Sequence, residues 1–237
     1  MTKFIFSLFF FLFINLPQID AQRQFCRLKI QRNFTKENIL FKKDSLIRQY
    51  TDYKTYPKSY ELAILTALSF FPELQNTFIE FAEKDIHTTM ACQPSMGSVF
   101  RTNRSYKIFI DDRISQEKNV LLSTVPFNAQ VGVIAHELCH ILDYEELTLV
   151  QLAKLGINYL DNEQKPHIEK RVDRMTIKKG LGWQLYDWSN FVLNLSEASN
   201  KYKKFKRETY LTPEEILEAV KGNRMYQHCL ESLKYTF

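Results

Sequence analysis

Two histidines four residues apart, with a glutamate directly after the first, stand in the run His136-Glu137-Leu138-Cys139-His140. On a helix, residues four apart lie on one face about one turn apart, so both imidazoles can reach one tetrahedral metal ion. Glu137 lies about 100° round the helix from His136. This offset keeps Glu137 off the metal but beside a metal-bound water, where a carboxylate can act as general base. The run therefore predicts a catalytic zinc site with its own base.

The residues around this run predict one continuous buried helix over about 128–147. Asn128 is a candidate N-cap, and no proline interrupts the segment. A broad apolar face is formed by Val131, Ile134, Ala135, Leu138, Ile141 and Leu142. The alternative is a helix whose histidines merely pair with nearby carboxylates. A third protein ligand would distinguish a zinc site from that arrangement.

One candidate third ligand is Glu146, six residues after His140. To bring Glu146 to the metal, the chain would have to turn sharply, and such a turn needs glycine three residues after the second histidine. Asp143 stands there instead. We therefore expect the helix to continue and to direct Glu146 elsewhere.

The other candidate is Glu169, which has Asp173 four residues later. Pro166 suits a first helical turn and Gly180 suits a helix end, so residues 166–179 are predicted to form a separate helix with Glu169 and Asp173 on one face. A ligating imidazole needs an acceptor for its other N–H, and Asp173 could supply it. The alternative is a surface pair neutralised by Lys170, Arg171 and Arg174.

H-E-x-x-H followed on a later helix by E-x-x-x-D resembles the gluzincins, a group of zinc metallopeptidases, over about residues 98–188. The resemblance implies a zincin-like α+β fold and a Zn²⁺ cofactor. The residues it assigns are His136, His140 and Glu169 as zinc ligands, Glu137 as general base and Asp173 as the acceptor that orients His136.

The remaining pattern predicts a small mixed sheet and a mostly helical C-terminal half. Strands are predicted near 77–81, 86–91 and 105–111, and the last of these is expected to be an edge strand packed against the metal helix. Helices are predicted over 57–71, 149–160 and 166–179, and from a capping box at Thr212 toward Leu230. An aromatic cluster around Trp183 and Trp188 is predicted to be core, with a substrate wall as the alternative.

The first residues predict export. A lysine followed by an apolar run and Ala21 is typical of a signal peptide over 1–21, with a retained anchor as the alternative. Residues 22–56 form an N-terminal segment that could include a pro-segment, and 57–237 form the zincin-like catalytic domain. We expect a secreted or periplasmic protein without stable membrane insertion after cleavage.

Net charge and cysteine content indicate which partners the protein could bind and which disulfides it could form. The net charge is +5, and the local basic run over 201–207 is expected to be a solvated loop rather than a nucleic-acid site. The four cysteines are Cys26, Cys92, Cys139 and Cys229. Cys26 and Cys229 could join the chain ends, whereas Cys139 on the apolar flank of the metal helix is expected to be buried.

Together these features predict a secreted zinc-dependent metallopeptidase that acts on a peptide or protein substrate. The alternatives are an exported scaffold, whose structural zinc Asp143 or Cys139 would close off, and a non-peptide zinc hydrolase. A peptidase also needs a donor for the transition state. The sequence leaves four candidates open: His228, His167, Tyr186 and Tyr159.

Overall fold

The computed structural model describes residues 30–101, 103–111, 113 and 118–234, and side chains as far as residue 229. The predicted signal peptide over 1–21 and Cys26 lie outside these ranges. In the part of the chain that is described, every helix is too short or too polar to span a bilayer. Within it the fold is mixed α+β, as predicted.

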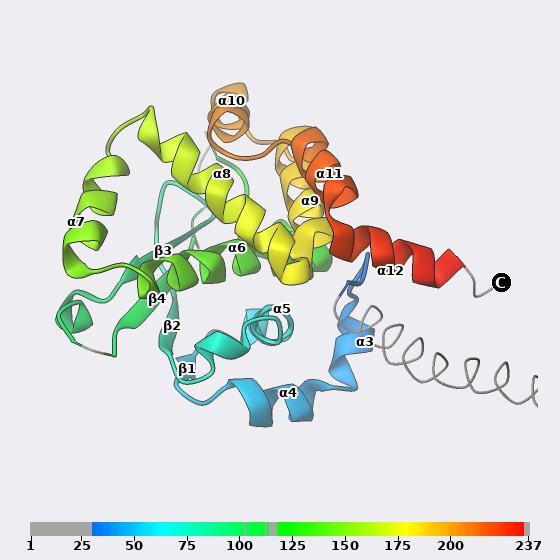
Figure 1. The fold of residues 1–237 in the computed structure, drawn as a ribbon, viewed down its shortest axis with the longest axis horizontal. Helices are drawn as coiled ribbons and strands as arrows, with labels where there is room; N and C mark the ends of the chain where they lie inside the picture. The colour runs from blue at the N-terminus through cyan, green and yellow to red at the C-terminus, as the bar shows by residue number, and fades with distance from the viewer. Residues whose placement is uncertain (1–29, 102, 112, 114–117, 235–237) are drawn as a thin grey trace, which may run out of the picture.

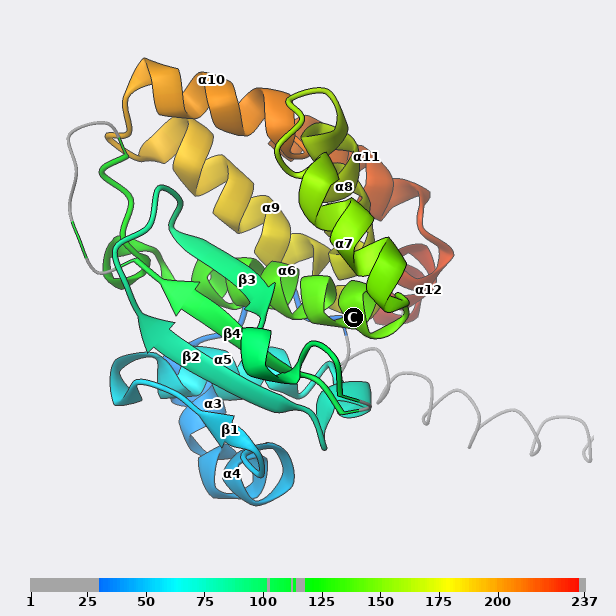
Figure 2. The ribbon, with the colours of Figure 1, turned by 90° about the vertical axis from the view of Figure 1, so that its left-hand side faces the viewer.

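The sheet has four strands among the described residues: β1 (Lys54–Thr55), β2 (Phe78–Glu83), β3 (Met90–Pro94) and β4 (Ser105–Ile110). Their order is β1-β2-β4-β3, and only β3 runs antiparallel to its neighbour. Alternate residues of β4, such as Ile108 and Ile110, are buried, while Lys107 pairs with Glu80 at 2.8 Å on the other face. Figure 2 shows the helices α5 (Glu61–Leu68) and α6 (Phe127–Glu145) behind the sheet.

The prediction that 105–111 is the edge strand is wrong. That strand is β4, which lies between β2 and β3, and the edge strand beside α6 is β3. The strand predicted at 86–91 is also displaced, to 90–94. Lys118 donates to the carbonyls of Ile86 and Thr88, and the Ile86 N–H binds the Asp111 carboxylate, so these residues contact side chains instead of continuing the ladder.

Helices make up most of the remaining chain (Figure 1). Before the sheet and beside α5 lie α3 (Lys36–Leu40) and α4 (Lys43–Tyr50). After α6 come α7 (Leu149–Asn158), α8 (Gln164–Thr176), α9 (Gly182–Asn190), α10 (Asn200–Thr209), α11 (Pro213–Gly222) and α12 (Arg224–Lys234). Ile177–Leu181 follows α8 and contains a kink at Gly180, whose φ of 95° is not helical. A short π-helical segment, Phe191–Leu195, follows α9.

The sequence predicted α5, α6, α7, α8 and α11 as helices, and it predicted their ends less well. It did not predict α3, α4 or α9. Asn128 is not the N-cap of α6, which begins after Pro126; its side chain instead accepts from the Phe34 N–H at 2.8 Å. The helix predicted from Pro166 begins two residues earlier, at Gln164. The capping box at Thr212 is confirmed, but the last predicted helix is interrupted at Asn223.

The basic run 201–207 is part of α10 rather than a loop. Ser199 caps this helix by accepting from the Tyr202 N–H. Lys206 is buried, with its ammonium 4.1 Å from the centre of the Tyr210 ring and facing other aromatic rings nearby. Aromatic faces attract a cation, so at least this lysine stabilises the fold instead of forming part of a solvated surface.

The centre of the molecule is α6, which is buried along most of its length (Figure 1). It packs on α9 so closely that a Cβ on Gly132 would stand 2.2 Å from the Gln184 carbonyl oxygen. Ile30, Phe34 and Ile39 from the N-terminal segment also enter the core. This packing fixes the helix that carries the metal motif.

Candidate metal centre

Three side chains from two helices converge beside the sheet. His136 and His140 come from α6, Glu169 comes from α8, and together they form a buried group that could hold a metal ion. The two Nε2 atoms stand 3.1 Å apart, and the Glu169 Oε2 lies 3.0 Å from that of His136 and 3.3 Å from that of His140. Ligands on a tetrahedral ion with bonds of about 2.0–2.1 Å lie about 3.3 Å apart. The separations therefore fit such an ion.

The outer nitrogen of each imidazole is also held. The His136 Nδ1–H donates to Asp173 at 2.8 Å, and the other oxygen of Asp173 accepts from the Leu211 N–H at 2.8 Å. The His140 Nδ1 lies 3.2 Å from the Tyr159 hydroxyl. Hydrogen bonds at Nδ1 orient the ring and leave Nε2 free to coordinate. Both histidines are thus prepared to present Nε2 to one ion.

The electrostatics favour a cation at this point. Burial lowers the pKa of His136, but the carboxylates of Asp173 and Glu169 outweigh burial and raise it to about 10. Burial raises the pKa of Glu169, and the two histidines more than reverse this, so its pKa falls well below the usual value. Both shifts have one cause: the buried carboxylates Glu169 and Asp173 favour a positive charge beside them, which a proton on His136 supplies when no metal is bound. A metal ion would supply that charge.

Glu137 lies beside this group without belonging to it. It is 5 % exposed and lines the same pocket as His140 and Glu169. Burial raises the pKa of Glu137 above the usual value, although the neighbouring histidines oppose the shift. A carboxylate with a raised pKa holds a proton more readily near neutral pH. Glu137 is therefore a buried carboxyl group that lines the pocket next to the candidate metal ligands.

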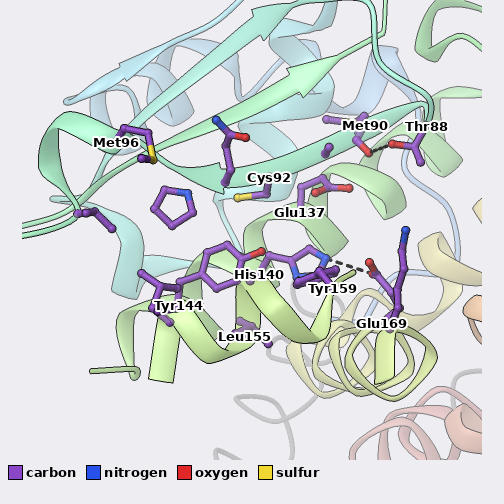
Figure 3. A pocket seen from close by; sticks show the side chains of 18 of the residues that line it. Thr88, Met90, Cys92, Met96, Glu137, His140, Tyr144, Leu155, Tyr159 and Glu169 are labelled. Atoms are coloured by element: carbon purple, nitrogen blue, oxygen red, sulfur yellow. Dashed lines mark hydrogen bonds and ion pairs between the residues drawn. The ribbon is translucent and has the colours of Figure 1, made fainter. Parts of the chain in front are cut away.

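A cavity of about 610 Å³ opens next to these residues. Its walls come from β3, from the segment 96–100 after it, and from α6, α7 and α8. In Figure 3, Glu137, His140 and Glu169 lie at one end of the pocket, and Met96 lies toward the other. The candidate metal centre is thus reachable from an open pocket rather than enclosed on every side.

The alternative metal ligands are elsewhere. Glu146 is exposed at the C-terminal end of α6, as expected for a helix that does not turn back. Asp143 pairs with Arg171, which binds both of its carboxylate oxygens. Cys139 is buried, as predicted, and its thiol is free.

The surface-pair interpretation of Glu169 and Asp173 is wrong, because both are buried. The nearby cations have other partners: Lys170 binds Glu215 at 3.0 Å, and Arg171 binds Asp143.

The two remaining cysteines that the structure describes differ in their bonding state. Cys92 is a free thiol on β3, and Cys229 is disulfide-bonded. Cys26, the partner that the sequence suggests for Cys229, lies outside the described residues.

Of the four donor candidates, three do not line the pocket. His228 and His167 are exposed, and Tyr186 packs against the Arg32 guanidinium. Tyr159 lines the pocket, but its hydroxyl contacts His140. Trp188 lies in the core and not in the pocket wall, which agrees with core packing for the aromatic cluster.

Sequence reasoning missed Tyr210. Its ring centre lies 5.6 Å from that of His136, and it lines the pocket together with Glu137. Burial, and then the carboxylates of Glu169 and Glu137, raise the pKa of its phenol well above the usual value, so it stays a donor. The bond from Leu211 to Asp173 holds this part of the chain at the site. No local motif marks Tyr210, because it reaches the site only through the packing of α10.

Comparisons with family models, curated proteins and solved structures found no match to this chain.

Proposed function

We propose that this protein is an extracytoplasmic zinc-dependent metallopeptidase with a zincin-like fold. The observation that carries the proposal is the joint placement of three buried ligands and one unligated glutamate at the end of an open pocket. Catalytic zinc sites use three protein ligands and keep one position open, whereas structural sites use four. The resemblance of the two helical motifs to gluzincins supports the same assignment.

The residues divide the work as follows. His136, His140 and Glu169 would hold the ion, and Asp173 and Tyr159 would orient the two imidazoles. Zinc, when bound, supplies Lewis acidity toward the scissile carbonyl and the attacking water. Glu137 would act as the general base, taking a proton from the attacking water and giving it to the leaving amine.

A peptidase also needs a donor for the oxygen that gains charge in the transition state. Tyr210 is the residue that the geometry favours for this role, because it lines the pocket beside Glu137 and keeps its phenolic proton. The edge position of β3 supports a peptide substrate, since an extended chain can pair with an open strand edge.

A structural-zinc scaffold and a non-peptide hydrolase are the competing functions. A scaffold would need a fourth protein ligand. Asp143 pairs with Arg171, and among the described residues neither Asp143 nor Cys139 belongs to the group that could hold a metal ion. A scaffold would also have no use for Glu137 beside the ion.

Replacing Glu137 with Gln tests the proposal. The variant keeps the size of the side chain and removes the base, so turnover of an unstructured peptide library should fall ~10²–10⁴-fold. Bound zinc, measured by elemental analysis after dialysis, should not change. A chelator should abolish wild-type activity, and added zinc should restore it.

Glu146→Gln is the matched control, because Glu146 lies on the exposed end of the same helix. It should retain both zinc and activity. If the zinc-loaded wild type, freed of any pro-segment, cleaves no member of the library, the peptidase assignment is wrong. Retained zinc would then favour the scaffold or a non-peptide hydrolase.

A further inference from the structure

The pocket continues from the metal centre into an apolar region between β3 and α7. Most of its lining is apolar, although Thr88, Gln93 and Lys165 also line it. The apolar lining residues include Met90, Val99, Leu149, Leu152, Ala153 and Leu155. The volume of about 610 Å³ lies within the range of natural ligand pockets, roughly 300–1,000 Å³.

Charge is almost absent from this wall. The described lining residues include three charged ones, Glu137, Glu169 and Lys165, and the first two belong to the metal centre. The Lys165 ammonium lies 5.1 Å from the centre of the Phe205 ring, which already offers it a partner. A charged group that entered the apolar region would lose water without gaining an ion pair, at a large cost in free energy. The pocket therefore favours an apolar occupant.

The backbone of β3 could orient a peptide in this pocket, because some of its N–H and C=O groups face the open edge of the sheet. The Thr89 carbonyl accepts from the Asp111 N–H at 3.0 Å, and the Ser95 N–H donates to the Ser105 carbonyl at 2.8 Å. Hydrogen-bonded positions alternate along an antiparallel ladder. Residues between Thr89 and Ser95 with even numbers consequently direct their backbone polar groups away from β4, toward the open edge.

Of these residues, Cys92 is the one suited to hold a substrate backbone. The Met90 carbonyl already accepts from the Thr88 hydroxyl at 2.7 Å, and Pro94 has no N–H. Cys92 presents both an N–H and a C=O, and it lines the pocket (Figure 3). One residue of an extended peptide could pair there while an adjacent side chain enters the apolar region.

Gly156 lies on the α7 side of this region. A Cβ built on Gly156 would meet no heavy atom within 4 Å, and the residue lines the pocket. Any side chain at this position would extend into open space and reduce the room for a ligand. A larger residue at position 156 would therefore limit the size of an occupant on this side of the pocket.

We propose that the apolar pocket selects peptide substrates with a bulky apolar side chain next to the cleaved bond, and that Gly156 determines this specificity. The inference rests on the proposed peptidase function for the cleavage step. The binding preference follows from the pocket itself and can be measured without cleavage.

The test compares Gly156→Leu with wild type on two peptide series that differ at one position, Phe or Ala. Wild type should prefer Phe by about tenfold or more in kcat/KM, because apolar pockets discriminate by roughly 10- to 200-fold for each methylene. Gly156→Leu should lose most of this preference by lowering kcat/KM for Phe peptides, and should change kcat/KM for Ala peptides by about twofold or less.

Gly222→Leu is the control. A Cβ at Gly222 also meets no heavy atom within 4 Å, but this residue lies at the end of α11 and does not line the pocket. It should retain the wild-type preference. Gly156→Ala adds a smaller step at the same position and should reduce the preference partly, which keeps the test decisive if the leucine variant folds poorly.

A binding measurement separates the two proposals. Zinc-loaded Glu137→Gln should bind a Phe peptide more tightly than its Ala counterpart by calorimetry, and adding Gly156→Leu should remove the difference. If wild type cleaves nothing but this binding difference is found, the pocket assignment stands and the peptidase assignment fails. If wild type cleaves both series equally, or if Gly156→Leu retains the preference, the role of Gly156 is overturned. Equal binding of both peptides would also overturn it.

Discussion

The contact of α6 with α9 and the hollow between α6, α7 and β3 are opposite environments on one helix. Toward α9, a Cβ on Gly132 would collide with the Gln184 backbone at 2.2 Å. Toward α7, a Cβ on Gly156 would meet no heavy atom within 4 Å, and a cavity of about 610 Å³ lies beside it. Gly132 therefore stands where a side chain has no room, whereas Gly156 stands beside open space.

This difference explains how a site can be both rigid and accessible. His136 follows Gly132 by about one turn, so the close contact with α9 fixes the helix just before this proposed ligand. His140 and Tyr144, further along α6, border the pocket. Ligands must be held within a fraction of an ångström, whereas a substrate needs room to enter. The dense contact meets the first need and the hollow meets the second.

The largest effect is expected from adding a methyl group at the close contact between α6 and α9. Gly132→Ala would force the α6 and α9 backbones apart, since the clashing atom is a carbonyl oxygen and not a flexible side chain. Overpacking typically costs about 1–3 kcal/mol of the free energy of unfolding, and a clash with backbone should lie at the upper end of this range. Urea denaturation of the purified variant would measure it, and zinc content should fall because the first ligand moves. An unchanged unfolding midpoint would show that the α6–α9 contact is not close.

A smaller effect is expected from the groups that orient the ligands. Asp173 lies away from the pocket, holds His136 at 2.8 Å, and is fixed by the Leu211 N–H. Tyr159 lies on the pocket side and contacts His140 at 3.2 Å. Asp173→Asn should weaken zinc binding about 10- to 100-fold, because it removes a charged acceptor. Tyr159→Phe should weaken it by about tenfold or less, because it removes a neutral one.

Competition with a chromophoric chelator would give both zinc affinities. The comparison between the two sides of the site would be contradicted if Tyr159→Phe had the larger effect. Lys170→Gln serves as the control, because Lys170 is on α8 between the two acidic residues and pairs with Glu215 rather than with the site. It should leave the zinc affinity unchanged.

The parts of the site that sequence analysis could predict are those that depend on helical spacing. His136, His140, Glu169 and Asp173 follow from i and i+4 positions on two helices, and the structure brings all four together. Their meeting also requires α6 and α8 to pack side by side, which no local pattern encodes. Resemblance to a known arrangement of motifs supplied that step.

The parts that it could not predict depend on distant packing. Strand order is set by pairing between segments that are far apart in the sequence. The sequence therefore could not show that the edge strand is β3 and not β4. Tyr210 reaches the site because α10 packs on α8, and no spacing relates it to His136. The pocket could not be predicted for the same reason, since its walls come from several segments between residues 88 and 210.

The smallest effect separates the two glycines most directly, because the same substitution should have opposite signs. Gly156→Ala adds a methyl group to α7 where no atom obstructs it. Alanine is favoured over glycine in a helix interior by about 0.5–1 kcal/mol, mainly because the unfolded chain loses freedom. Gly156→Ala should therefore raise the free energy of unfolding by about this amount, while Gly132→Ala lowers it. Paired urea titrations would measure both. A destabilised Gly156→Ala would mean that α7 moves inward and that the hollow beside Gly156 is filled in solution.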